Sequence, residues 1–496
     1  MRKSSKMESI VEKLRDYPFT EKMLFCQVNS TRMMTPNSID IFNTPNVVYP
    51  WELEVFAEFS LFADGNNPRR HINATADDFV KIINAIRNYQ HPYLKSQKNM
   101  SYANALIMIM GLQQFKSQEN IIDRLYRYNY FWNFTNERID MPSIFSTHFP
   151  GLTYTDFKEL GVLIFFYSAL KCGSSAQVIN YWSAKYRKVV DVLTISREKY
   201  KADQSSKIND SFENAIYGFN YLHPYPYIEH QGYIFLPLPY LIIDAVTDSL
   251  LTRITFDNNS LREKIGKEVA QSYIESIFNE CSVYDEVLSE QEYYVGKNKI
   301  DTPDILIKKE SMFCLIDTKL SVPKLELRKF NEKAIAETIS RYANHIIQVY
   351  RRVQDFTNGK YYPFAKPANV EKDDAYGIVA LLEDSFIPRR QIYQEVFQLL
   401  KLEPNSDEAN YIKSHINITS FHDLELFALG SRDIFIALTK KRDTPSKWND
   451  MKLFNSDLYP KDSFNRINSV EDFITGLQQT ITQTIDELVE LGIVQK

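Results

Sequence analysis

The sequence predicts an α/β fold in which a mixed sheet flanked by helices is joined to a large, mainly helical N-terminal domain. Apolar residues recur at helical spacing over most of the first half, and short apolar runs typical of strands alternate with helices from about residue 258. With 496 residues, the chain is also too long for one ordinary core. We therefore expect a helical domain over 1–255, an α/β domain over 256–440 and a C-terminal extension with an amphipathic helix over 441–496.

In the first half, apolar residues three and four apart predict helices at 76–88, 102–115, 157–170 and 176–193. The polar stretch 197–210 predicts a loop or hinge. The Tyr- and Pro-rich stretch 221–240 predicts a short hairpin and an extended connector, because its four prolines disfavour a helix. A helix is then expected over 240–251.

The second half has a different pattern. A helix over 261–280 carries an apolar residue at every fourth position, and strand-like runs follow at 292–295, 305–307 and 312–318. The subsequent elements are expected to be a helix at 330–354, a strand at 376–382 and a helix at 391–400. A strand at 416–419 and helices at 423–429 and 470–491 complete the chain. The order helix, three strands, helix, strand indicates an α/β unit with a mixed sheet.

Composition excludes several function classes. The formal net charge of −5 gives no global signature of nucleic-acid binding, so any such contact requires a local basic surface. With 14 glycines, the chain has neither a phosphate-binding loop nor a dinucleotide-binding fingerprint. The four cysteines are far apart, which disfavours a structural zinc site or a disulfide framework. No His-x-x-x-His pair occurs, which disfavours a zinc hydrolase. Without an apolar leader or membrane span, the chain is expected to be cytoplasmic, with no membrane partner.

One hairpin brings charged residues together. Two apolar runs flank the polar turn 308–311, which is the pattern of a β-hairpin. Asp304 opens the first strand, while Asp317 and Lys319 lie two apart on the second and so share a face. Phosphodiester hydrolysis uses this combination: carboxylates hold Mg²⁺ or Mn²⁺, and an ammonium beside the metal orients water and stabilises developing charge.

The arrangement resembles the PD-(D/E)XK nuclease superfamily, through Pro303-Asp304, Asp317-Thr-Lys319 and the order of elements between 258 and 384. The resemblance implies a restriction-endonuclease-like fold, metal ligation by Asp304 and Asp317, and a water-orienting role for Lys319. Many members add a glutamate from the first core helix. The resemblance implies this role for Glu268, with Glu275 as the alternative.

Two other Asp-x-Lys triplets, at 156–158 and 450–452, lack a preceding strand and an upstream Pro-Asp, so the triplet alone carries little information. Basic residues after the motif, Lys324, Arg328 and Lys329, are candidates for nucleic-acid binding. An ordinary solvated helix face is the alternative. Gln348 lies in the helix where some superfamily members carry a glutamine, although its spacing from Tyr350 differs.

We therefore expect a Mg²⁺-dependent phosphodiesterase, specifically a DNA endonuclease in restriction or antiviral defence. A catalytically inactive nuclease-fold module that binds DNA or protein within a larger complex is one alternative. A helix-mediated assembly protein with an accidental motif is another. The apolar stripe of the terminal helix is compatible with docking on its own domain, with a homo-oligomer or with a regulatory partner protein.

Overall fold

The computed structural model describes residues 6–33, 48–63, 75–89, 105, 108, 111–112, 119–169, 175–208, 220–365, 370–443 and 465–493. The chain divides into two compact units. Unit 1 comprises Met1–Lys95, Asp140–Asp257 and Thr475–Lys496, and unit 2 comprises Ser96–Ile139 and Asn258–Ile474. This division differs from the three consecutive segments expected from the sequence, because local patterns do not indicate which distant stretches pack together.

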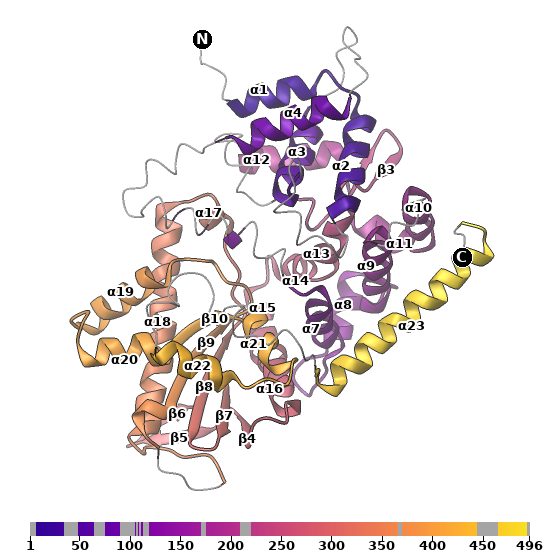
Figure 1. Ribbon diagram of the computed structural model, residues 1–496. Helices are drawn as coiled ribbons and strands as arrows, with labels where there is room; N and C mark the ends of the chain where they lie inside the picture. The colour runs from indigo at the N-terminus through magenta and orange to yellow at the C-terminus, as the bar shows by residue number, and fades with distance from the viewer. Residues whose placement is uncertain are drawn as a thin grey trace. The chain divides into compact units, whose positions relative to one another are not determined.

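Unit 1 is mainly helical (Figure 1). Its helices are α1 (Lys6–Leu14), α2 (Phe19–Met33), α3 (Pro50–Phe62), α4 (Ala76–Arg87), α8 (Met141–His148), α9 (Tyr154–Ala169), α10 (Ser175–Lys185), α11 (Arg187–Val192), α12 (Arg197–Ile208), η5 (Pro239–Leu241), α13 (Ile242–Val246) and α14 (Asp248–Thr255). The strands β1 (Thr194–Ser196), β2 (Tyr227–His230) and β3 (Tyr233–Phe235) form a small sheet in that order. The expected hairpin in the Tyr- and Pro-rich stretch is thus confirmed as β2–β3.

Sequence periodicity located α4, α9, α10, α11, α13 and α14, whereas it did not predict α1, α2, α3 and α8 individually. Helix α4 begins after the capping residue Thr75 and buries its four predicted apolar residues. The expected helix 176–193 is divided at Tyr186 into α10 and α11, and the expected helix 240–251 is divided at Thr247. The expected helix 102–115 lies almost entirely outside the described residues.

The loop expected at 197–210 was wrong for the described residues 197–208, because these form α12. Tyr200 on this polar helix is fully buried and donates a hydrogen bond to Asn220, and Gln204 is buried as well. Tertiary packing therefore stabilises this helix, and the polar composition of the segment does not reveal that packing.

Unit 2 contains a mixed five-stranded sheet covered by helices (Figure 1). The sheet order is β10-β9-β8-β7-β4, in which β4, β7 and β8 run antiparallel and β8, β9 and β10 run parallel. The strands are β4 (Glu286–Ser289), β7 (Ile305–Lys309), β8 (Met312–Lys319), β9 (Ala375–Leu381) and β10 (Ile416–Ser420). The helices are α7 (Ile121–Asn133), α15 (Asn259–Ile265), α16 (Gln271–Glu280), α17 (Leu325–Arg328), α18 (Glu332–Thr357), α19 (Arg389–Leu400), α20 (Asp407–His415), α21 (Phe421–Ala428), α22 (Ile434–Asp443) and α23 (Asn468–Glu490), the last of which continues into unit 1.

The long helix α18 packs against β8, β9 and β10, and α16 packs against β4 and β7. Gly377 on β9 permits a close approach, because an added Cβ would lie 2.6 Å from Val349 of α18. Strands β9 and β10 are buried along their whole length. The expected α/β class with a mixed sheet is therefore confirmed.

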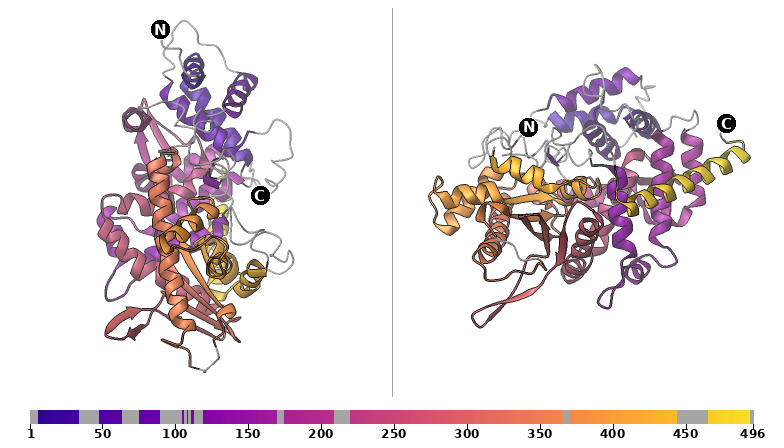
Figure 2. Two further views of the ribbon diagram at one scale, coloured as in Figure 1. Left: turned by 90° about the vertical axis from the view of Figure 1, so that its left-hand side faces the viewer. Right: turned by 60° about the horizontal axis from the view of Figure 1, so that its bottom comes forward.

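Two details differ from expectation. The strand expected at 292–295 belongs instead to a separate hairpin of β5 (Glu292–Val295) and β6 (Asn298–Asp301), which projects from the sheet (Figure 2). The first strand of the main sheet is β4, whose short sequence carries a weaker apolar signal. The expected helix 261–280 is interrupted by the π-helical turn η6 (Gly266–Ala270).

None of the described helices combines the length and the apolar character needed to cross a membrane.

Candidate metal centre

Strand register aligns three carboxylates across neighbouring strands. Ser289 of β4 pairs with Ile305 of β7, and Ile305 pairs with Ile316 of β8. The next residues toward the same sheet edge are Glu290, Asp304 and Asp317. Opposite residues of antiparallel strands lie close together, so the row follows from the pairing. This edge also contains the end of β8, where Lys319 lies.

Asp304 is half-buried and tied to the adjacent strand. Its Oδ2 atom accepts hydrogen bonds of 2.6 Å from both the main-chain N–H and the hydroxyl of Thr318. These two bonds hold the carboxylate of Asp304 against β8, next to Asp317. The sequence placed Asp304 and Asp317 together on one hairpin, and the structure brings them together there.

Asp317 is 5% exposed, and its Oδ2 atom lies 2.7 Å from Nζ of Lys319. Burial raises the pKa of Asp317 to about 6, with a further contribution from Asp304, although Lys319 acts in the opposite direction. The Lys319 side chain is 26% exposed. The ammonium thus neutralises a buried carboxylate and still reaches solvent.

Glu290 joins these residues, although the sequence did not identify it. Burial raises the pKa of Glu290, and Asp304 and Asp317 raise it further, while Lys267 lowers it. The ion pair between Lys267 and Glu290 spans 4.0 Å. Glu290 follows β4, which pairs with the motif hairpin. Because the sequence did not predict β4, it did not identify Glu290.

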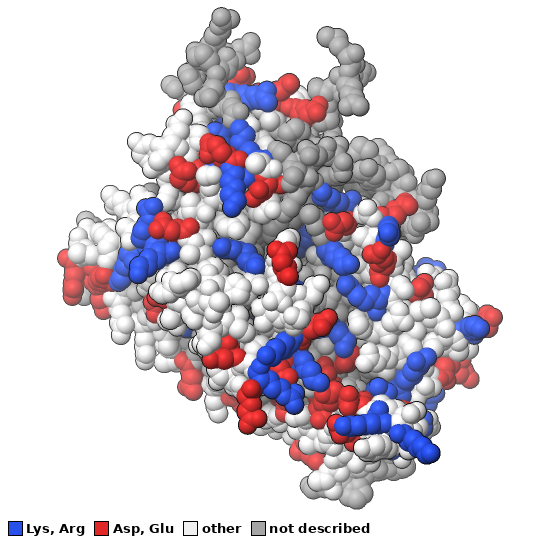
Figure 3. Space-filling view, turned by 180° about the vertical axis from the view of Figure 1, so that it is seen from behind, with Lys and Arg blue, Asp and Glu red and all other residues white. Residues whose placement is uncertain are grey.

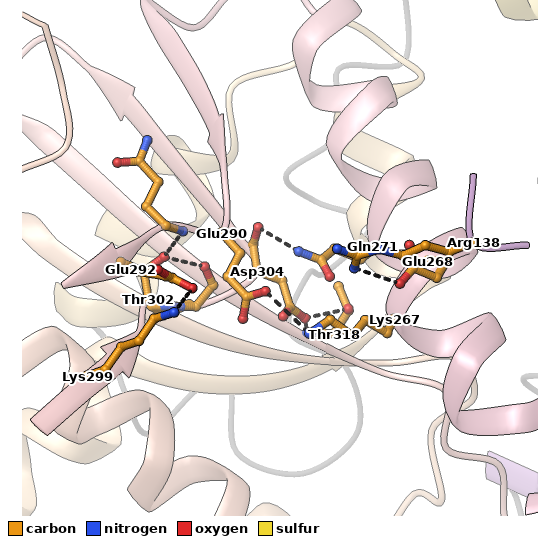
Figure 4. Close-up of polar contacts among 12 residues, drawn as sticks. Arg138, Lys267, Glu268, Gln271, Glu290, Glu292, Lys299, Thr302, Asp304 and Thr318 are labelled. Atoms are coloured by element: carbon orange, nitrogen blue, oxygen red, sulfur yellow. Dashed lines mark hydrogen bonds and ion pairs between the residues drawn. The ribbon is translucent and has the colours of Figure 1, made fainter. Parts of the chain in front are cut away.

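Glu268 does not point toward the aspartates. It accepts a 3.1 Å hydrogen bond from Arg138 (Figure 4) and another of 3.1 Å from Asn136. Gln271, three residues later, instead donates a 3.3 Å hydrogen bond to the main-chain carbonyl of Asp304. The π-turn η6 accommodates an extra residue and so shifts which side chains of the following helix face the sheet.

The alternative residue Glu275 accepts a hydrogen bond from Ser289 at 2.6 Å. The first core helix therefore places an amide next to Asp304, and the third nearby carboxylate comes from the end of β4. The glutamate that the resemblance implied on the helix is directed elsewhere in this structure.

The donor set fits a hard cation bound through few protein ligands. Within the described ranges, no three His, Cys, Asp or Glu side chains are gathered closely enough to hold a metal ion on their own. Mg²⁺ commonly keeps several waters and takes one or two carboxylates, which Asp304 and Asp317 provide. Their mutual proximity, which raises the pKa of Asp317, is the electrostatic setting that a cation relieves.

Helix α18 adds basic groups along one face, at Arg341, His345 and Arg352. Burial lowers the pKa of His345 to about 4, and Lys319 and Arg341 lower it further. Arg352 contributes to lowering the pKa of Asp317. Gln348 falls between His345 and Arg352 at helical spacing and is exposed. The candidate glutamine therefore lies on the α18 face that interacts with the site.

The remaining basic candidates lie between β8 and α18. Lys324 is exposed immediately before α17, Arg328 is the last residue of α17, and Lys329 follows it. On the face shown in Figure 3, basic and acidic side chains are interspersed, so that net charge alone does not mark a binding surface there.

The structure separates the motif from one of the two similar triplets. Asp156 accepts hydrogen bonds from the backbone and hydroxyl of Thr153, at the start of α9 in unit 1. It therefore caps a helix and lies on no strand. The triplet at 450–452 falls outside the described residues.

Comparison with protein-family models, with curated proteins and with solved structures found no match.

Proposed function

We propose that this protein is a metal-dependent nuclease of restriction-endonuclease-like fold that hydrolyses phosphodiester bonds in DNA. One observation carries the proposal: Asp304 and Asp317 face each other across the β7–β8 hairpin, with Lys319 2.7 Å from Asp317. Carboxylates for a hard cation and an adjacent ammonium are the groups that phosphodiester hydrolysis requires.

In this proposal Asp304 and Asp317 hold Mg²⁺ or Mn²⁺, with Glu290 as a further acceptor through water. When bound, the cation supplies charge neutralisation of the phosphate and lowers the pKa of a coordinated water. The hydrogen bonds from Thr318 orient Asp304, and Gln271 holds the backbone at the same residue. Lys319 orients the attacking water and stabilises the charge that develops on the phosphate oxygens.

The substrate strand would run past α18, whose Arg341 and Arg352 offer positive charge beside the carboxylates. A large helical unit attached to such a domain, in a sequence without a motor motif, suits an endonuclease in restriction or antiviral defence. That biological assignment rests on analogy between architectures.

A catalytically inactive module that binds DNA is the second candidate. It is favoured by the Asp317–Lys319 ion pair together with the lack, in the described part of the chain, of three gathered metal-ligating side chains. In such a module the same residues would stabilise the sheet edge.

A cleavage assay tests the proposal. Supercoiled plasmid and linear DNA are incubated with the full-length protein and Mg²⁺ or Mn²⁺, beside Asp317→Asn and Lys319→Met. We expect nicking or cutting by the wild type and a loss of at least about a hundredfold in each variant, because each removes a group needed in the transition state.

Lys333→Met is the matched control for Lys319→Met, since Lys333 is 86% exposed and lies on α18. Cleavage that persists in Asp317→Asn would rule out the assigned site. DNA binding without cleavage by the wild type, under either metal, would favour the inactive module.

A further inference from the structure

A second polar site lies at the carboxyl ends of β9 and β10. A small recess there opens to solvent. Its walls include Arg328 and Pro323 from the segment after β8, Asp384 and Phe386 from the segment after β9, and His422 and Asp423 from α21. We call this the β9–β10 recess. Ligands of open α/β sheets commonly bind at the carboxyl ends of parallel strands.

Two buried polar atoms of this recess have no hydrogen-bond partner among the described residues. These atoms are Nδ1 of His422, a residue 6% exposed, and Oδ1 of Asp423, a residue 2% exposed. The other carboxylate oxygen of Asp423 accepts hydrogen bonds from Thr419 and from Ser420. Since buried polar groups are nearly always paired, the two remaining atoms indicate where a polar ligand belongs.

Arg328 supplies a cation at the same recess. It is half-buried, and within the described ranges its guanidinium has no hydrogen bond or ion pair. Asp384, by contrast, is already paired, because it accepts hydrogen bonds from Arg389 and from the main-chain N–H of Phe386. The recess therefore offers the guanidinium of Arg328, one carboxylate oxygen of Asp423 and one imidazole nitrogen of His422. Its lining also includes the side chains of Glu119 and Glu383 and apolar surface from Phe386 and Pro323.

The β9–β10 recess lies beside the strand that carries the proposed catalytic lysine. The N–H of Leu382 donates to the carbonyl of Lys319 at 2.9 Å, and the N–H of Glu383 donates to the carbonyl of Ser321 at 3.0 Å. Strands are about 4.8 Å apart, so β10 is roughly 10 Å from β8. That spacing is comparable to one or two nucleotides of an extended strand.

We propose that the β9–β10 recess binds one unpaired nucleotide of the substrate strand, close to the phosphodiester that is cleaved. The base edge would donate an N–H to Asp423 and bond to His422, its ring would lie against Phe386 and Pro323, and its phosphate would meet Arg328. This inference rests on the proposed nuclease function and adds a substrate preference to it: a strand with an unpaired or extruded base.

Binding of short oligonucleotides to the full-length protein tests the proposal, with EDTA present to prevent hydrolysis. The probes are 5′-fluorescein tetranucleotides of each base and an abasic tetranucleotide of equal charge, followed by fluorescence anisotropy. We expect the wild type to bind at least one base-bearing probe at least about tenfold more tightly than the abasic one. Equal affinity for all probes would overturn the proposal.

Two variants locate this binding. Arg328→Gln is expected to weaken binding at least about fivefold, because it removes the phosphate contact. Lys333→Gln, which removes an equal charge from a position that is 86% exposed, should remain within about twofold. His422→Leu should abolish the preference for base-bearing probes. The guanidinium of Arg328 is half-buried and unpaired in the described structure, so Arg328→Gln is expected to fold. This variant still tests the recess if His422→Leu does not fold. Equal effects of Arg328→Gln and Lys333→Gln would overturn the proposal.

Free nucleoside monophosphates distinguish the two sources of the ligand. If a free mononucleotide binds as tightly as the best tetranucleotide, the recess is a site for free nucleotides and the substrate-strand assignment is overturned.

A cleavage assay of the same variants distinguishes failure of this inference from failure of the proposed function. Base-dependent binding without cleavage would contradict the nuclease alone, while cleavage unaffected by Arg328→Gln and His422→Leu would contradict the recess alone.

Discussion

At the scale of single residues, the carboxylate of Glu290 shows how strand register can place a residue at a site that its local sequence does not mark. It follows β4, directly after the pair Ser289–Ile305, and interacts electrostatically with Asp304 and Asp317. Glu268 satisfies the sequence pattern for a helix-borne ligand, yet it bonds to Asn136 and Arg138. We therefore expect substitutions of Glu290 and Glu268 to affect metal-dependent cleavage differently.

Glu290→Gln is expected to reduce metal-dependent cleavage about 10-fold to 100-fold, because it removes an acceptor next to the metal-binding carboxylates. Glu268→Gln, which makes the same chemical change, should remain within about threefold of the wild type. Initial cleavage rates across a Mg²⁺ titration provide the measurement. A larger loss in Glu268→Gln than in Glu290→Gln would show that the helix residue, as the sequence implied, is the ligand.

A buried ion pair gives a prediction for stability. Arg127 on α7 donates to both oxygens of Glu425 on α21, at 2.7 and 2.8 Å, and Tyr273 of α16 also donates to Glu425. Arg127→Met should lower the free energy of unfolding by about 3 to 5 kcal/mol, because Glu425 would be left charged and buried without its cation. Urea denaturation checks this value.

The control is Arg138→Met. Arg138 is 69% exposed and also pairs with a glutamate, and solvent-exposed pairs contribute at most about 1 kcal/mol. Similar losses of stability in both variants would mean that Arg127 does not act through a desolvated pair.

At the scale of elements, helix α22 carries a cation in its packed face. Lys441 is buried at 7% exposure, and burial lowers its pKa to about 7, with a further contribution from Arg389. In the unfolded chain this lysine binds its proton up to about pH 10.4. Between about pH 7 and 10 the unfolded state therefore holds more protons, and this residue makes stability rise with pH.

Lys441→Met should consequently stabilise the protein at pH 7, by about 1 to 3 kcal/mol, and flatten the rise between pH 7 and pH 10. Chemical denaturation at several pH values measures both effects. Lys264→Met, at an exposed position of α15, should match the wild type at every pH. A pH profile unchanged in Lys441→Met would refute the assignment.

The sequence predicted those elements whose stability comes from their own pattern. The motif hairpin and α18 were found because their apolar residues alternate or recur over a long window, and this located Asp304, Asp317 and Lys319. Helix α12 was missed because its apolar signal is weak and packing around Tyr200 stabilises it. Strand β4 was missed because a four-residue strand is defined by its pairing partner. The π-turn η6, which directs Glu268 away from the aspartates, was not predicted, because the apolar periodicity of a helix does not reveal it.

At the scale of the whole molecule, each unit has its own core and its own buried charges. In unit 1, His223 pairs with Asp244 at 2.6 Å and with Glu54 at 3.1 Å. Burial opposes protonation of His223, but the two carboxylates outweigh it and raise its pKa to about 9. The stability that this charge contributes is present below about pH 6.5, where the unfolded histidine is also protonated, and is lost as pH rises through 9. Unit 1 thus responds to pH through a residue far in sequence from the candidate metal centre.

This division predicts that a metal ion and alkaline pH act on different parts of the chain. In calorimetry with two resolved transitions, Mg²⁺ at about 100 times its dissociation constant should stabilise the unit 2 transition by about 2.7 kcal/mol. The unit 1 transition should not move with Mg²⁺, because Asp304 and Asp317 both belong to unit 2. Raising the pH from 7 to 10 should weaken unit 1, and His223→Gln should remove that sensitivity and so identify its transition. Asp304→Asn should abolish the Mg²⁺ effect without changing the pH response of unit 1. Stabilisation of both transitions by Mg²⁺, or of the unit 1 transition alone, would be incompatible with a metal centre on the β7–β8 hairpin as the main binding site.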